Sequence, residues 1–229
     1  MRIADVRFVW GLGMAVMICG AIAASKNTEL KLDGMELHYV NAQAVKYAGR
    51  DSMEVTYAGP AELSDAERFA VVRGLRMKDG VVEVDLTGDT TKDASPTARG
   101  FVGLAFRMSG DRSHFECIYL RPKNGRAEDQ LQRNHATQYV SMPGYPWDKL
   151  RAESPGKYES YVDLVAGQWT HMKIVVEGKS AKLFVNGAEQ PSLIVNDLKQ
   201  EPMEGDIALW VGPGTVAHFA NLQVDRKKD

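Results

Sequence analysis

Charged side chains that could do acid–base chemistry recur on neighbouring strand-like stretches. Glu83 and Asp85 alternate with apolar residues in VVEVDLT, and Arg107, His114 and Glu116 flank the turn between GFVGLAFRM and FECIYL. A carboxyl group whose pKa is shifted by neighbouring charges can act as a general acid or base. We therefore take Glu116 as the candidate catalytic residue, with Arg107 and His114 setting its pKa or stabilising negative charge. Because outer faces of β-sandwiches are normally polar, the same pattern also fits a face without a function.

A long polar excursion follows these strands. Residues 121–136 and 143–157 flank one strand-like stretch, and loops of more than about a dozen residues are uncommon and often functional. Planar polar groups suit neighbouring hydroxyls of a sugar, and flat aromatic rings suit its C–H face. The candidate substrate-binding residues here are Arg121, Arg126, Asn134, His135, Tyr145 and Trp147. The alternative is a solvated helical turn followed by an aromatic plug at the end of the core.

The pairing of two strands decides where these groups would meet. We expect Phe106 opposite Phe115 and Leu104 opposite Cys117, because a shift by one residue would place Glu116 beside Phe106 in the core. In this register Arg107, His114 and Glu116 share one face with Glu83 and Asp85, which would contact substrate. The excursion would fold over that floor, and Cys117 would be a small buried apolar residue.

Short strand-like stretches separated by turns dominate the chain after residue 29. Asp79-Gly80 and Asn186-Gly187 are hairpin signals, since both residue types tolerate a positive φ. We expect one continuous strand over 36–47 and another over 158–165. Many evenly spaced strands without alternating helices predict an all-β fold, an antiparallel sandwich of two sheets.

The first 24 residues have the pattern of a signal peptide. Arg2 and Arg7 precede an apolar stretch that ends in a small-residue cleavage motif at 21–23. We expect residues 25–229 to form one exported domain, periplasmic or secreted, and a retained anchor helix is the alternative. Ile18 makes a poor lipobox before Cys19. After cleavage only Cys117 remains, so no disulfide can form within the mature chain.

Composition narrows the possible partners. A net charge of −2 provides no general attraction to nucleic acid or to an anionic membrane. The sequence contains no phosphate-binding loop, no HExxH motif and no cysteine cluster, and its histidines are scattered. We therefore expect no cofactor and no dedicated metal site, although calcium remains open. The expected partner is a carbohydrate, and the sequence leaves the oligomeric state open.

Four stretches carry a resemblance to a known superfamily: RMKDGVVEVDLTG, GFVGLAFR, WTHMKIVVEGKSAKLFVNGAEQP and GDIALWVGPGTVAHFANLQV. In this order they resemble the concanavalin A-like lectin/glucanase superfamily over residues 66–225, and laminin-G-like and 3-keto-disaccharide hydrolase domains are most similar. The resemblance implies a jelly-roll sandwich, whereas activities differ widely within the superfamily.

The resemblance implies less about catalysis. The retaining glucanases of this superfamily carry Glu-x-Asp-x-x-Glu on one strand. Glu83 and Asp85 match its first two acids, but Thr87 and Gly88 stand where the third would be, and double displacement needs two suitably placed carboxylates. Arg107 and Glu116 resemble polar strand positions of the keto-disaccharide hydrolases.

Three functions fit these observations. The chain could be a glycoside hydrolase acting on keto-sugar glycosides, with Glu116 as general acid or base. It could be a glycan-binding module without catalysis, using the same floor and the aromatic loop. It could also be an interaction domain whose long loop docks a protein.

Overall fold

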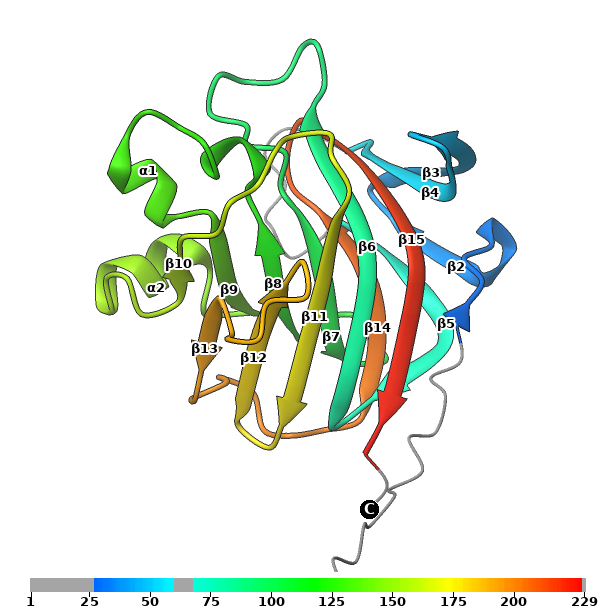
Figure 1. Ribbon diagram of the computed structural model, residues 1–229. Helices are drawn as coiled ribbons and strands as arrows, with labels where there is room; N and C mark the ends of the chain where they lie inside the picture. Colours follow the sequence, from blue (N-terminus) through cyan, green and yellow to red (C-terminus); the bar gives the residue numbers. More distant parts are fainter. Residues whose placement is uncertain (1–26, 60–67, 228–229) are drawn as a thin grey trace, which may run out of the picture.

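The computed structural model describes residues 27–59 and 68–227, and they form two antiparallel sheets packed face to face (Figure 1). The fold is an all-β, two-sheet jelly-roll sandwich, as the sequence predicts. The predicted signal peptide lies outside the described residues.

The first sheet, sheet A, has β6 and β15 at its centre. In spatial order it contains β13 (Leu193–Val195), β12 (Ser180–Val185), β11 (Thr170–Glu177), β6 (Gly80–Thr90), β15 (Thr215–Arg226), β4 (Arg50–Tyr57) and β3 (Val40–Tyr47), with β1 (Asn27–Thr28) paired to β15.

The second sheet, sheet B, has β7 and β8 near its centre. In spatial order it contains β10 (Glu159–Ser160), β9 (Thr137–Met142), β8 (Phe115–Leu120), β7 (Val102–Met108), β14 (Gly205–Val211), β5 (Phe69–Met77) and β2 (Met35–His38).

The helices of the described residues are short. The excursion after β8 contains η3 (Pro122–Asn124), α1 (Gln130–Asn134) and α2 (Trp147–Glu153), whereas η1 (Leu32–Gly34) precedes β2 at the opposite end of sheet B. Figure 1 shows α1 and α2 beside β9 and β10, so the long excursion of the chain is folded into local structure at this edge. Asp129 caps α1 by accepting a hydrogen bond from the backbone N–H of Gln132 at 2.6 Å.

The main core lies between the sheets. Val82, Val84 and Leu86 of β6 face inward, as their alternation predicts, and meet Leu104 and Phe106 of β7. A second apolar cluster lies on the face of sheet B turned away from sheet A, here called the outer face. Its members are Phe69, Val71, Ala105, Met108, Phe115, Cys117, Tyr119, Val140, Met142, Ala208 and Trp210.

Two expectations about strand connections are wrong. The stretch 36–47 is divided at Tyr39, whose φ of 47° turns the chain from β2 in sheet B to β3 in sheet A. The Asp79-Gly80 turn joins β5 to β6 and therefore passes between sheets instead of closing a hairpin. A Cβ atom at Gly80 would lie 2.1 Å from the Asp225 carbonyl oxygen, which explains glycine at this crossing.

Other boundaries follow the sequence more closely. The predicted strands 115–120 and 137–142 have their expected ends, whereas the strand expected over 158–165 is limited to Glu159–Ser160. Asn186 and Gly187 both have positive φ values, 53° and 73°, the backbone conformation expected of an Asn-Gly turn.

Candidate functional site

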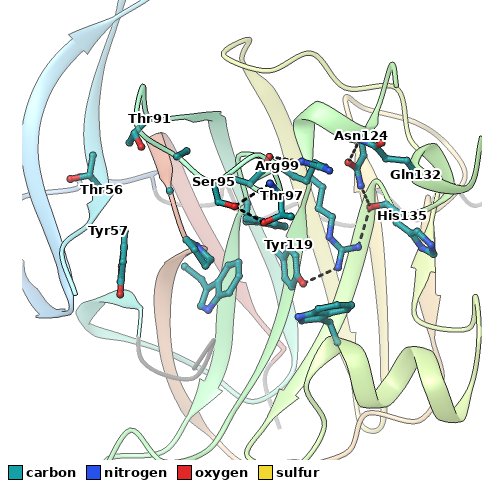
Figure 2. A pocket seen from close by; sticks show the side chains of 18 of the residues that line it. Thr56, Tyr57, Thr91, Ser95, Thr97, Arg99, Tyr119, Asn124, Gln132 and His135 are labelled. Atoms are coloured by element: carbon teal, nitrogen blue, oxygen red, sulfur yellow. Dashed lines mark hydrogen bonds between the residues drawn. The ribbon is translucent and has the colours of Figure 1, made fainter. Parts of the chain in front are cut away.

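A groove of about 1220 Å³ opens where β8 ends and the long excursion begins. This volume exceeds the range of about 300–1,000 Å³ that is usual for small-molecule sites. Its walls come from the loop 91–100 after β6, from the segment 124–135, and from α2. Figure 2 shows Ser95, Thr97 and Arg99 of the loop on one side of Tyr119, and Asn124, Gln132 and His135 on the other.

Aromatic side chains from sheet B form the floor of this groove. The rings of Tyr119 and Trp210 stack with their centroids 4.5 Å apart, and Phe101 meets Tyr119 edge-on at 6.2 Å. Tyr119 projects outward because Leu120 and Ile118, its neighbours on β8, face the core between the sheets. A Cβ atom at Gly212 would lie 2.6 Å from Phe101, so the glycine makes room for this ring.

A buried ionic network supports one wall. Arg121 is 4% exposed and donates to Glu159 Oε1 at 3.0 Å, to Gln138 Oε1 at 2.9 Å and to the Tyr119 hydroxyl at 3.1 Å. Arg151 of α2 also donates to both carboxylate oxygens of Glu159. Since these contacts engage much of the Arg121 guanidinium, Arg121 positions the wall by linking the ends of β8, β9 and β10.

The network also fixes charge states. Burial alone would raise the pKa of the Glu159 carboxyl, but hydrogen bonds from Arg151 and the charge of Arg121 hold this pKa below its usual range. Burial lowers the pKa of the His135 imidazole, and the charge of Glu159 opposes that effect. His135 Nδ1 lies 2.9 Å from Glu159 Oε2, outside hydrogen-bond geometry. Two arginines therefore share one carboxylate beneath the groove.

The accessible wall combines an aromatic ring with oriented polar groups. Trp147, the first residue of α2, is 38% exposed, and the Arg151 guanidinium lies 4.7 Å from the centre of its ring. Gln132, which is partly exposed, is held from behind by the buried Asn124 amide, which accepts a hydrogen bond from Gln132 at 3.1 Å and donates to the His135 carbonyl oxygen at 2.9 Å. On the facing loop, the Ser95 and Thr97 hydroxyl oxygens lie 2.9 Å apart. Such a surface can cover a flat apolar face and hydrogen-bond hydroxyl groups at its edge.

The floor predicted from Arg107, His114 and Glu116 is wrong, because the register of β7 and β8 differs by one residue. Glu116 lies opposite Phe106, and Cys117 opposite Ala105. Glu116 therefore points into the sandwich with no exposed surface, whereas Cys117 is buried on the outer face.

Polar partners make the burial of Glu116 possible. Its carboxylate accepts hydrogen bonds from the Tyr139 hydroxyl at 2.6 Å and from the backbone N–H of Gln200 at 2.9 Å. Burial raises the pKa of Glu116, and these hydrogen bonds oppose the increase. Local sequence disfavours this register, because it does not reveal the partners that β9 and the crossover before β14 supply to Glu116.

Arg107 and His114 lie at the far end of the strands from the groove. Arg107 has a φ of 53° and donates to the Lys78 carbonyl oxygen and to Asp79, each at 2.7 Å. His114 is exposed in the hairpin and contacts the Ser113 hydroxyl at 2.7 Å. The groove lies at the Leu120 end of β8, about 17 Å away by strand rise. The loop therefore does not cover these residues.

Glu83 and Asp85 lie on the outer face of the opposite sheet. Asp85 accepts hydrogen bonds from Arg50 and Asn221, both at 2.8 Å, and lies 2.9 Å from His171 Nδ1. Glu83 lies 3.4 Å from the His171 imidazole and 3.4 Å from the Lys173 ammonium group. The core separates both carboxylates from the groove.

The remaining predicted binding residues divide into two groups. Arg121, His135 and Trp147 line the groove, and Asn134 lines an adjoining cavity. Arg126 instead forms an exposed ion pair with Asp163 at 2.7 Å, and Tyr145 packs against the core between the sheets.

Several residues around the groove were missed at the sequence level. They are Phe101, Tyr119, Arg151, Trp210 and the loop 91–100. The ten-residue polar loop TKDASPTARG was a signal of the same kind as the longer excursion. Trp210 gave no comparable signal, because an aromatic residue in a strand is normally assigned to the core.

Two further observations concern metal binding and membrane-spanning helices. No group of three or more His, Cys, Asp or Glu side chains within 27–59 and 68–227 is placed to hold a metal ion. None of the helices in these same ranges is long and apolar enough to cross a membrane.

Comparison with known proteins places the fold. The structure is similar to the carbohydrate binding module CBM66 from Bacillus subtilis, with a TM-score of 0.56 and 14% identity, covering 86% of this chain and 96% of that chain. It is also similar to a Bacillus subtilis protein of unknown function with a galectin-like fold, with a TM-score of 0.54 and 13% identity, covering 84% of this chain and 89% of that chain. No protein-family model and no curated protein sequence matches the chain. The chain therefore has the concanavalin A-like jelly-roll fold.

Proposed function

We propose that this protein binds a carbohydrate in the groove between the loop 91–100 and α2. The observation that carries the proposal is the position of Trp147, a partly exposed ring at the groove beside polar side chains held by a buried network. Aromatic faces suit the C–H surface of a sugar, and planar amides and hydroxyls suit its edge. Carbohydrate binding by a structural neighbour of the same fold adds support by analogy.

The proposal can be tested by titrating the protein with sugars from a glycan array. Trp147→Ala should weaken binding by about 1–3 kcal/mol, roughly 5- to 150-fold, because one large aromatic contact is lost. The matched control is Tyr39→Ala, since Tyr39 is 49% exposed but does not line the groove. Equal affinities of the wild type and the Trp147 variant would contradict the proposal, as would an array with no bound sugar.

Hydrolysis of a keto-sugar glycoside in the same groove is the second candidate. The observation in its favour is that two carboxylates, Asp93 and Asp129, line the groove. Asp129 already caps α1, which leaves Asp93 as the freer acid. A keto-glycoside turnover assay on the preparation used for binding separates the two candidates. Turnover that is lost in Asp93→Asn while binding remains would favour the hydrolase, and binding without turnover favours the module.

Export is part of the proposal and rests on the N-terminal sequence alone. The basic start, the apolar stretch and the small-residue motif at 21–23 indicate cleavage after Ala23 or Ala24. The mature protein would then be periplasmic or secreted, where it could meet extracellular glycans. N-terminal sequencing of the protein from its native compartment should begin at Ala24 or Ser25, and an intact Met1 would contradict export.

A further inference from the structure

A second cavity of about 580 Å³ adjoins the groove at the edge of sheet B. Leu131, His135 and Arg151 line both cavities, so these residues form the boundary between them. Beyond this boundary the cavity is lined by β10, by the Pro155-Gly156 turn after α2, and by Asn134 and Tyr161. The two hollows are therefore adjacent parts of one recessed surface.

Exposed apolar side chains are concentrated along this surface. Among the described residues, eight large hydrophobic side chains are exposed, and three of them line these cavities: Leu131 at 67%, Trp147 at 38% and Tyr161 at 42%. They come from α1, α2 and the residue after β10, so the tertiary fold brings them together. Apolar groups gathered in a recess characterise a binding surface more than scattered exposure does.

Tyr161 is held in place as a platform. The Arg133 guanidinium lies 5.1 Å from the centre of its ring and donates to its hydroxyl at 3.1 Å. Trp147 has a similar arrangement, since Arg151 lies over its ring. A ring held by an arginine loses less conformational entropy when a ligand stacks on it.

We propose that the ligand is a linear oligosaccharide that continues from the groove into the second cavity, with one sugar unit at Trp147 and a later unit at Tyr161. The oligosaccharide would cross the boundary formed by His135 and Arg151, and the Asn134 amide would be available to sugar hydroxyls in the second cavity. This inference rests on the proposed carbohydrate function and adds the ligand class to it. A site for a single terminal sugar would need only the groove.

The inference is tested by the dependence of affinity on chain length. Calorimetric titrations would use cello-, xylo-, laminari-, arabino- and fructo-oligosaccharides of two to six units. In the series that binds, affinity should increase by about tenfold or more beyond the disaccharide, since a second stacking contact is added. Tyr161→Ala should remove this increase and leave the disaccharide affinity unchanged, whereas Trp147→Ala should weaken binding at every length.

Controls separate the second cavity from general effects. Tyr161→Phe keeps the ring and should keep the gain with length, and Tyr39→Ala should behave as the wild type. Thermal unfolding of each variant checks that the fold is retained. Two results would contradict sugar binding in the second cavity alone. One is an affinity that stays constant beyond two sugar units, and the other is an equal loss of affinity in Tyr161→Ala at all oligosaccharide lengths. Absence of binding in every series would overturn the carbohydrate function as well.

Discussion

The outer faces of the two sheets have different characters. On sheet A, alternate residues of β11 are buried and the others are partly or fully exposed, and Glu83 and Asp85 each contact the His171 imidazole. On sheet B, every residue of β7, β8 and β9 is buried, and the outer face is an apolar cluster of eleven residues. The groove lies at the end of the apolar face.

The difference shows where a ligand site can form in this sandwich. On sheet A, Asp85 pairs with Arg50 and Glu83 with Lys173, within 3.4 Å, and both carboxylates remain part of a polar outer surface. Sheet B instead supplies a floor of stacked rings, and the excursion after β8 adds a wall held by Arg121 and Glu159. The proposed carbohydrate site therefore combines an aromatic floor with ordered loops, and the charged outer face of sheet A offers neither.

The largest expected effect comes from the buried network behind the groove. Arg121→Met leaves Glu159 buried with only Arg151 as a close hydrogen-bonding cation, so the free energy of unfolding should decrease by about 3–5 kcal/mol. Urea unfolding measures this change. Arg126→Ala is the matched control in the same excursion, because its ion pair with Asp163 is exposed and should contribute little. Equal unfolding midpoints for the two variants would contradict the positioning role of Arg121.

Cys117 tests whether the outer face of sheet B is a true core. The thiol has no exposed surface, so a thiol reagent should label it only after unfolding. Cys117→Ser should destabilise the protein by about 1–3 kcal/mol, because it places a polar hydroxyl in an apolar cluster. Mass spectrometry of native and denatured samples detects the labelling. Rapid labelling of the native protein would show that this face is open.

Glu116 gives a pH-dependent effect of intermediate size. Its folded pKa lies above the unfolded value near 4.5, so the native state holds the proton more tightly. This group's contribution to stability should decrease as the pH rises from about 4.5 through the folded pKa, because the folded protein must then bury a charge. Glu116→Gln should therefore reduce this pH dependence of stability between pH 5 and pH 8.

Urea unfolding at several pH values measures this slope for both proteins. Sugar binding should be unchanged in the variant, since the side chain is enclosed between the sheets. A variant that keeps its stability but loses binding or turnover would restore a catalytic role for Glu116.

Strand patterning predicted the architecture of this protein but not the pairing of its central strands. The inward faces of β6 and β7 follow directly from alternation, because Val84 and Leu104 sit between polar or small residues. In β8 alternation is ambiguous, since Phe115, Cys117 and Tyr119 are as apolar as Ile118 and Leu120. Both faces of this strand are buried, and its register depends on distant partners of Glu116 that local sequence does not reveal.

The site was predictable to the extent that it depends on local features. Loop length and aromatic content indicated Trp147 and His135. The contributions of Tyr119 and Trp210 depend on which face of sheet B is turned outward, and that of Arg151 depends on Glu159, eight residues away. Side chains that act through tertiary contacts of this kind cannot be recognised from spacing alone.

The smallest effects should come from the charged face of sheet A. Glu83→Gln removes the ion pair with Lys173 at a partly exposed position, so the free energy of unfolding should change by no more than about 1 kcal/mol. Its sugar affinity should equal that of the wild type, because the core lies between this face and the groove. Gln132→Ala is the comparison variant at the groove. It should weaken sugar binding, because it removes the amide group that donates a hydrogen bond to Asn124 and orients it. Calorimetry with the same sugar measures both. Weaker binding in Glu83→Gln, with unchanged binding in Gln132→Ala, would move the carbohydrate site from sheet B to sheet A.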